Sequence, residues 1–187
     1  FINYKVKSQD MIKFKKVKID RQNKRFLNIQ YLENIYNLIK KYDNYLNDDY
    51  SHTTDLFEEV ISLITRTSPF FWVILKNEEF AGVVYLENII GNDKHLHSAE
   101  VVTAFERKFW GKDTKICAKK FVMYCFKKLK LKKLKALVFK ENFRTESILK
   151  ACGMTFEALL KAETLKNNKL QDIKIYSIIR GKRNEHN

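Results

Sequence analysis

The chain has 187 residues, of which 45% are hydrophobic and 13% aromatic, so it is long and apolar enough to fold around a core. Its formal net charge of +14 favours polyanions, acidic protein surfaces and anionic cofactors as partners. No apolar run reaches the roughly 18 residues of a membrane-spanning helix and no signal-peptide pattern is visible, so we expect a cytoplasmic protein with no membrane partner.

The sequence contains three cysteines and four histidines. An odd number of cysteines excludes a complete disulfide framework, and reduced thiols in a cytoplasm are the simplest interpretation. The cysteines are not at metal-ligand spacing from one another or from a histidine, so we expect no metal site. They are Cys117, Cys125 and Cys152.

The first part of the chain predicts a strand followed by a helix. Residues 1–11 carry no strong pattern, and we interpret them as a leader or disordered extension, with Met11 as a possible natural start. Apolar and basic residues alternate over Ile12–Ile19, which predicts an edge strand with one wet face. Apolar residues recur at spacings of three and four over Ile29–Leu46, which predicts an amphipathic helix.

A second helix and a β-hairpin follow. The helix is predicted to start at a cap, either Thr54 or Asp55, and to end before Pro69. The apolar runs Phe70–Lys76 and Phe80–Glu87 are separated by a short polar turn, and this pattern predicts two hairpin strands.

The second half is predicted to alternate strands and helices before a final hairpin. Its strands are Leu96–Phe105, Leu134–Phe139, Phe156–Thr164 and Gln171–Arg180. One helix follows Gly111 and another spans Asn142–Cys152, with Gly153 as its C-terminal stop. Without an internal linker, this order predicts one α/β domain over residues 12–180 and a solvated tail over residues 181–187.

The stretch Ser98–Lys130 organises the rest of the chain. It consists of an apolar strand, a turn with one glycine at Gly111, and a helix. Such an order makes an anion site, because the free N–H groups of the first helical turn point at one place and the helix dipole favours negative charge there. The alternative interpretation is an ordinary strand-to-helix corner.

Two motifs give this region a family resemblance. Ala99–Thr103 (AEVVT) precedes Lys108–Asp113 (KFWGKD), and Asn142–Thr145 (NFRT) precedes Gly153-Met154. This arrangement over Phe70–Arg180 resembles the GNAT superfamily of acyl-CoA-dependent N-acyltransferases, closest to the branch of ribosomal-protein N-terminal acetyltransferases. The resemblance implies a mixed, mostly antiparallel central sheet with helices on both faces.

The resemblance also implies a site for acetyl-CoA as acyl donor, without a metal. The pyrophosphate would lie on the backbone amides from Phe109 to Thr114, and the pantetheine arm along the strand edge at Ala104–Phe105. Arg144 would lie near the adenosine phosphates. The implied cofactor-binding residues are Ala104, Phe105, Lys108, Phe109, Trp110, Gly111, Lys112, Asp113, Thr114, Asn142 and Arg144.

Two positions depart from the family pattern. Lys108 replaces the usual Gln or Arg, and Asp113 replaces a second Gly or Ala. The Asp113 carboxylate can cap the helix start, where it would compete with the pyrophosphate for the same N–H groups and repel it. Neighbouring lysines, including Lys112, offset part of this charge. Trp110 either stacks on the adenine or covers the helix entry.

Acyl transfer to an amine needs a base, because an ammonium group has no lone pair. Glu100, an acid in an otherwise apolar strand, is the candidate catalytic base. Its alternative role is a carboxylate paired with lysine or solvent, and His95 or His97 is an alternative base. Asn142 is a catalytic candidate near the thioester, or else a helix N-cap. The tyrosine that several family members carry seven residues beyond the asparagine is replaced here by Leu149.

Two functions follow. The first is an acetyl-CoA-dependent N-acetyltransferase that acts on a primary amine of unknown identity, such as a protein N-terminus, a small amine or an aminoacyl group. The second is a catalytically silent GNAT-fold binding module. Its basic face, including Lys127–Lys135, would dock on RNA, a ribosome-associated partner or an acidic protein, although this cluster is also typical of a solvated helix end.

Overall fold

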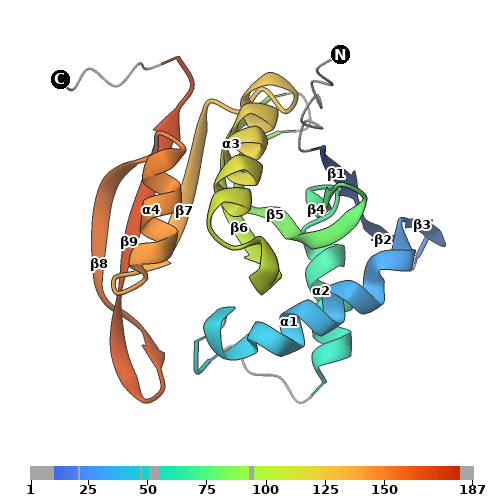
Figure 1. The fold of residues 1–187 in the computed structure, drawn as a ribbon, viewed down its shortest axis with the longest axis horizontal. Helices are drawn as coiled ribbons and strands as arrows, with labels where there is room; N and C mark the ends of the chain where they lie inside the picture. Colours follow the sequence, from blue (N-terminus) through green and yellow to red (C-terminus); the bar gives the residue numbers. More distant parts are fainter. Residues whose placement is uncertain (1–10, 21, 47, 51–54, 93–94, 182–187) are drawn as a thin grey trace, which may run out of the picture.

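The computed structural model describes residues 11–20, 22–46, 48–50, 55–92 and 95–181. Seven strands form one sheet (Figure 1). Their order across the sheet is β1 (Ile12–Lys16), β4 (Phe71–Lys76), β5 (Glu79–Gly91), β6 (Leu96–Phe105), β7 (Lys133–Phe139), β9 (Lys169–Ile179) and β8 (Thr155–Lys166). Every neighbouring pair is antiparallel except β6 and β7, which are parallel. The mixed, mostly antiparallel sheet is therefore confirmed.

Helices cover both faces of the sheet (Figure 1). They are α1 (Leu32–Leu46), α2 (Leu56–Arg66), α3 (Lys112–Lys127) and α4 (Phe143–Ala151), with short 3-10 turns η1 (Ile29–Tyr31) and η2 (Arg107–Phe109). One buried cluster joins the sheet to α3 and α4 and includes Trp72 and Phe121. A second cluster joins the sheet to α1 and α2 and includes Leu38 and Phe71. None of the helices described is long and apolar enough to cross a membrane.

The caps of α2 and α4 lie where the sequence placed them. The Asp55 carboxylate accepts a hydrogen bond from the Glu58 N–H at 3.0 Å, and the Asn142 side chain accepts one from the Thr145 N–H at 3.1 Å. Each bond satisfies one of the orphan amides of a first helical turn. The alternative cap Thr54, the predicted leader before Met11 and residues 182–187 of the predicted tail lie outside the described residues.

The predicted strand Ile12–Ile19 is wrong in its second half. Its first half is β1, an edge strand as expected, but Lys18–Asp20 forms β2 and pairs with β3 (Arg25–Leu27) in a separate two-stranded sheet. The cause is burial, because Val17 and Ile19 lie in the core beneath α1 and α2 and so direct the chain away from β4. Strand β5 also continues four residues beyond the predicted end, to Gly91.

Close backbone packing in the sheet requires a glycine at position 82. The register between β4 and β5 shifts at Ile74/Leu75, opposite Gly82. A Cβ atom at Gly82 would lie 2.1 Å from the Ala104 carbonyl oxygen of β6. That contact involves backbone on both sides, so no side-chain movement can relieve it.

We therefore expect Gly82→Ala to destabilise the fold by roughly 2 kcal/mol or more, as overpacking does in tight cores. Urea unfolding measures this change. Gly181→Ala is the matched control, because that glycine also has a positive φ, of 85°, but an added Cβ meets nothing within 4 Å. Equal unfolding free energies for the two variants would contradict the packing argument.

Candidate active site

Strands β6 and β7 part in the middle of the sheet. They pair only at Ser98/Lys133, Ala99/Leu134 and Glu100/Lys135. Beyond this point β7 continues to pair with β9 as far as Phe139/Ile173, whereas β6 stays with β5 up to Phe105/Gly82. The last five residues of β6 therefore have a neighbouring strand on one side only.

The register shows which backbone groups face the side without a strand. The Glu106 N–H donates to the Ala81 carbonyl of β5 at 2.9 Å, and alternate residues of a strand point their N–H and C=O groups to opposite sides. Ala104 therefore points its backbone toward β5, while Thr103 and Phe105 point theirs toward the gap. Of the predicted edge Ala104–Phe105, only Phe105 presents its N–H to the gap, and Thr103 joins it.

A turn with free amides follows β6. Gly111 is the N-cap of α3 with φ 88° and ψ −114°, and no side chain caps the helix there. The first α3 amide with a backbone acceptor is that of Lys115, which donates to the Gly111 carbonyl at 3.1 Å. Among the described residues, nothing accepts from the N–H groups of residues 111–114, and these groups gather at the positive end of the helix dipole.

The expectation that Asp113 caps this helix is wrong. Its carboxylate forms an ion pair with the Lys76 ammonium of β4 at 2.6 Å, and the two side chains are only 24% and 14% exposed. Lys76 reaches the carboxylate because β4 lies under the same end of α3 and both belong to the α3 face of the sheet. The pair neutralises the acid, so it neither occupies the free amides nor adds a net negative charge beside them.

Trp110 spans the two sides of the gap. Its indole N–H donates to the Phe105 carbonyl at 2.9 Å, the Arg144 guanidinium of α4 lies 5.1 Å from its ring centroid, and the Tyr42 ring of α1 lies at 5.8 Å. The Tyr42 hydroxyl also accepts from the Arg107 N–H at 3.0 Å. Trp110 thus covers the helix entry, as one of the two interpretations expected, and it holds Arg144 beside the turn.

The remaining predicted phosphate-site residues differ in their ion-pair and hydrogen-bond partners. Lys108 forms an ion pair with Glu79, while Lys112 is exposed and has no acid within ion-pair distance among the described residues. The Thr114 hydroxyl donates to the Phe109 carbonyl at 2.8 Å, and both of these side chains are buried. Their hydrogen bond shapes the turn. The Phe109 N–H donates to the Glu106 carbonyl at 2.9 Å and the Trp110 N–H to the Arg107 carbonyl at 3.1 Å. Of the predicted amides from Phe109 to Thr114, only those of residues 111–114 are therefore free among the described residues.

Glu100 lies at the last paired position before the strands part. Its carboxylate accepts from the Lys135 ammonium at 2.9 Å and from the Asn88 side-chain amide at 2.7 Å. Both oxygens are therefore engaged, which matches the lysine-paired alternative. The pair closes the narrow end of the gap.

Sequence reasoning missed a second acid beside it. Glu87 of β5 lies directly opposite Glu100, on the same face of the sheet, and accepts no hydrogen bond from the described residues. Burial raises the pKa of the Glu87 carboxyl; nearby Arg66 lowers this pKa and Glu100 raises it. The available signal was the one that identified Glu100, an acid within an otherwise apolar strand.

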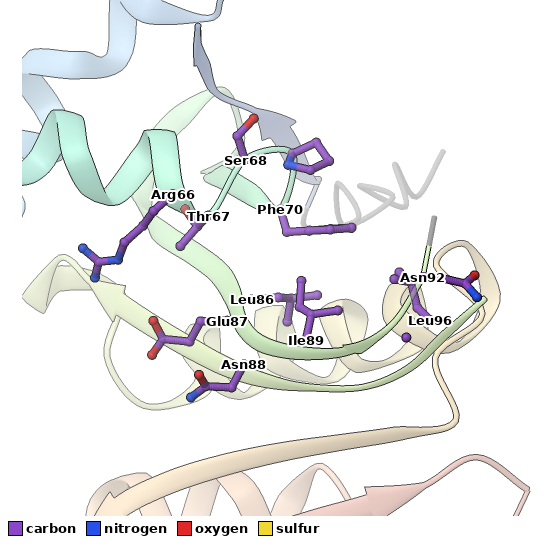
Figure 2. A pocket seen from close by; sticks show the side chains of 12 residues that line it. Arg66, Thr67, Ser68, Phe70, Leu86, Glu87, Asn88, Ile89, Asn92 and Leu96 are labelled. Atoms are coloured by element: carbon purple, nitrogen blue, oxygen red, sulfur yellow. The ribbon is translucent and has the colours of Figure 1, made fainter. Parts of the chain in front are cut away.

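A cavity of about 610 Å³ borders Glu87. It lies between the end of α2 and the second half of β5, where β4 no longer covers that strand. Figure 2 shows Arg66, Glu87 and Asn88 pointing to one side of it, while Leu86 and Ile89 face Phe70. The cavity thus has an apolar wall and a charged rim.

The other candidate residues do not meet at the gap. His95 and His97 are exposed at the start of β6, and His97 lies three residues, about 10 Å, before Glu100. Asn142 serves as the N-cap of α4, and Leu149 is buried. Tyr176 of β9, a tyrosine that could be considered in place of the one replaced by Leu149, is buried under α4, where burial and the Glu146 carboxylate raise its pKa. The described residues include no group of three metal-ligating side chains.

A comparison with models of protein families identifies the family of this chain. Residues 30–155, more than half of the chain, match the model of the acetyltransferase (GNAT) domain. The chain belongs to the GNAT acetyltransferase family. This confirms the family that the two motifs predicted. A comparison with curated protein sequences finds no significant match.

Solved GNAT structures share the whole architecture. A ribosomal-protein alanine acetyltransferase from Vibrio fischeri has a TM-score of 0.68 at 17% identity, covering 84% of this chain and 92% of its own. A variant of the Vibrio cholerae spermidine N-acetyltransferase has a TM-score of 0.70 at 22% identity, covering 90% and 93%. A ribosomal alpha-N-protein acetyltransferase in complex with coenzyme A has a TM-score of 0.71 at 14% identity, covering 90% and 93%.

Proposed function

We propose that this GNAT member is an acetyl-CoA-dependent N-acetyltransferase that transfers an acetyl group to a primary amine. The observation that carries the proposal is the row of free amides over residues 111–114, next to the parted strands β6 and β7. A pyrophosphate at these amides would be held by N–H groups and the helix dipole. The resident Asp113 is compatible with it, because Lys76 already balances that charge.

The strand edge and α4 support the rest of the donor site. The Phe105 N–H and the backbone of Thr103 face the gap, where they can bond to the amides of a pantetheine arm. Arg144, held against Trp110 at 5.1 Å, keeps its N–H donors available to a phosphate at the edge of the turn. Acetyl-CoA supplies the activated thioester, and these residues orient it.

The two acids Glu87 and Glu100 support different roles in the proposed proton transfer. The amine nitrogen bonds to the thioester carbon, its proton leaves to a base, and the sulfur departs as a thiol after taking up a proton. We assign the base role to Glu87, because its carboxylate is free and half-buried, whereas Glu100 is held by Lys135 and Asn88. Glu100 then acts as a positioning residue whose charge keeps Glu87 basic.

We propose that the acceptor is an amine and that it enters the site beside Glu87, at the rim of the cavity. The named activities of the similar structures, on spermidine and on ribosomal protein, fit this class. The alternative is a catalytically silent module, which both Asp113 and the replacement of the family's tyrosine by Leu149 would favour. The Lys76 ion pair removes the objection that Asp113 raises, so we favour the enzyme.

Gly111→Glu should abolish the rise in melting temperature that acetyl-CoA causes, because it places a carboxylate among the amides that would hold the pyrophosphate. Gly111→Ala is the control. It imposes the same backbone cost at φ 88°, meets nothing within 4 Å and adds no charge. A thermal-shift titration that shows equal acetyl-CoA responses for both variants would speak against an anion site at this turn.

Lys76→Met should weaken acetyl-CoA binding, because it leaves the Asp113 charge uncompensated beside the phosphate site. The double variant Lys76→Met/Asp113→Asn should restore binding to near the wild-type level, since neither charge remains. Calorimetric titration measures the three dissociation constants. An affinity that does not change in Lys76→Met would show that the ion pair has no part in donor binding.

Glu87→Gln should lower kcat about 100-fold or more, a size typical of a lost general base. In the wild type, activity should fall as pH drops through the pKa of Glu87, which lies above the ordinary value of 4.5 because the buried carboxylate is harder to ionise. This fall in activity at low pH, the acid limb of the pH–activity profile, should disappear in Glu87→Gln. In Glu100→Gln it should move to lower pH, because a repelling charge is lost.

Thiol release from acetyl-CoA, with spermidine and a peptide with N-terminal alanine as acceptors, measures these profiles. An unchanged acid limb in Glu87→Gln would assign the proton to another group.

A further inference from the structure

The segment Thr114–Lys140, which runs from the first turn of α3 through β7, contains no acid. From Thr114 to Lys140 there is neither Asp nor Glu, although the whole chain has 22 such residues. The lysines of this segment are Lys115, Lys119, Lys120, Lys127, Lys128, Lys130, Lys132, Lys133, Lys135 and Lys140. With ten lysines and no acid, this segment has a net charge of +10, compared with +14 for the whole chain.

Five exposed lysines of this segment, together with Lys112 at the start of α3, lie on α3 and on the loop that follows it. On α3, Lys112, Lys119 and Lys127 lie on the solvent side together with Met123, which is 51% exposed, whereas Phe121 and its neighbours face the core. A helix of 16 residues is about 24 Å long. Further exposed lysines follow in the loop after the helix. They are Lys128, Lys130 and Lys132. We call these six lysines the lysine stripe.

The stripe lysines differ from three neighbouring lysines in their ion-pair partners. Lys133, Lys135 and Lys140 form ion pairs with carboxylates on neighbouring strands. None of the stripe lysines has a carboxylate within 4 Å among the described residues. Mutual repulsion of unpaired cations is relieved by a polyanion, which releases counterions when it binds.

The side chains between the lysines indicate the kind of polyanion. The exposed face of α3 carries no Arg, Asn or Gln, the residues that read bases in the major groove of DNA. It carries no fully exposed aromatic ring on which single-stranded bases could stack. An A-form RNA duplex is recognised mostly through its shape and its phosphates, and its major groove is deep and narrow, so two phosphate rows lie close together.

We propose that the lysine stripe binds the phosphate backbone of double-stranded RNA. The stripe shares only Lys112 with the proposed acetyl-CoA site, because its other five lysines lie beyond the first turn of α3. RNA bound there would cover the α3 face of the sheet, opposite the face that carries Glu87 and Glu100.

The test compares two triple variants with the same charge. Lys119→Glu/Lys127→Glu/Lys130→Glu changes the stripe, and Lys24→Glu/Lys161→Glu/Lys169→Glu changes exposed lysines elsewhere. Each substitution removes two positive units, so three of them lower the net charge from +14 to +8 in both proteins. Fluorescence anisotropy with an RNA duplex of about 20 base pairs measures binding by the full chain over a range of salt concentrations.

We expect salt-dependent binding by the wild type, a loss of about tenfold or more with a shallower salt slope in the stripe variant, and a smaller loss in the control. Equal losses in both variants, or no salt-dependent binding by the wild type, would overturn the proposal. So would equal binding of a DNA duplex, or equal competition by polyglutamate, which would indicate an acidic protein partner. An unchanged acetyl-CoA thermal shift in the stripe variant shows that the fold and donor site are intact.

Discussion

The parallel contact between β6 and β7 is the constraint on which the rest of the site depends, and it covers only three residue pairs. Antiparallel pairing holds β6 to β5 and β7 to β9 over much longer stretches, so the sheet consists of two well-paired halves joined by a short seam. The Glu100–Lys135 ion pair lies at the end of this seam. Beyond it the halves diverge, and the backbone of Phe105 is left without a partner strand.

The open seam places three kinds of group together. The turn after β6 brings the free amides of α3 to its wide end, and α4 brings Arg144 to the same end from the other half. Trp110 connects the two halves through contacts with Phe105 and Arg144. At the narrow end, Glu87 and Glu100 face the α1 and α2 side. The proposed anion site and the proposed base Glu87 therefore lie at opposite ends of the gap.

An ion pair compensates the charge of the residue that departs most from the family motif, Asp113. An aspartate in the first turn of α3 would oppose a phosphate if it were alone, but Lys76 comes from a strand that lies beneath that turn. The two residues are 37 positions apart in the chain. The local motif therefore identifies Asp113 as unusual, but it cannot reveal Lys76, whose positive charge balances the carboxylate.

The sequence predicted the fold well because its signals were local and consistent. Apolar periodicity and the caps at Asp55 and Asn142 located most helices and strands, and two spaced motifs identified the family. The split of Ile12–Ile19 was missed because burial of Val17 depends on packing against α1 and α2. Glu87 carries the same local signal as Glu100, an acid in an apolar strand, but only the strand register shows that the two acids lie opposite each other. Contacts between distant segments decide such features.

The most direct measurement is an amide NMR titration of the ¹⁵N-labelled protein with acetyl-CoA. The account predicts that the largest shifts occur at the amides of residues 111–114 and of Phe105, with smaller shifts elsewhere in α3. Shifts confined to other surfaces, or no shifts at saturating acetyl-CoA, would contradict the claim that these unpaired amides form the donor site.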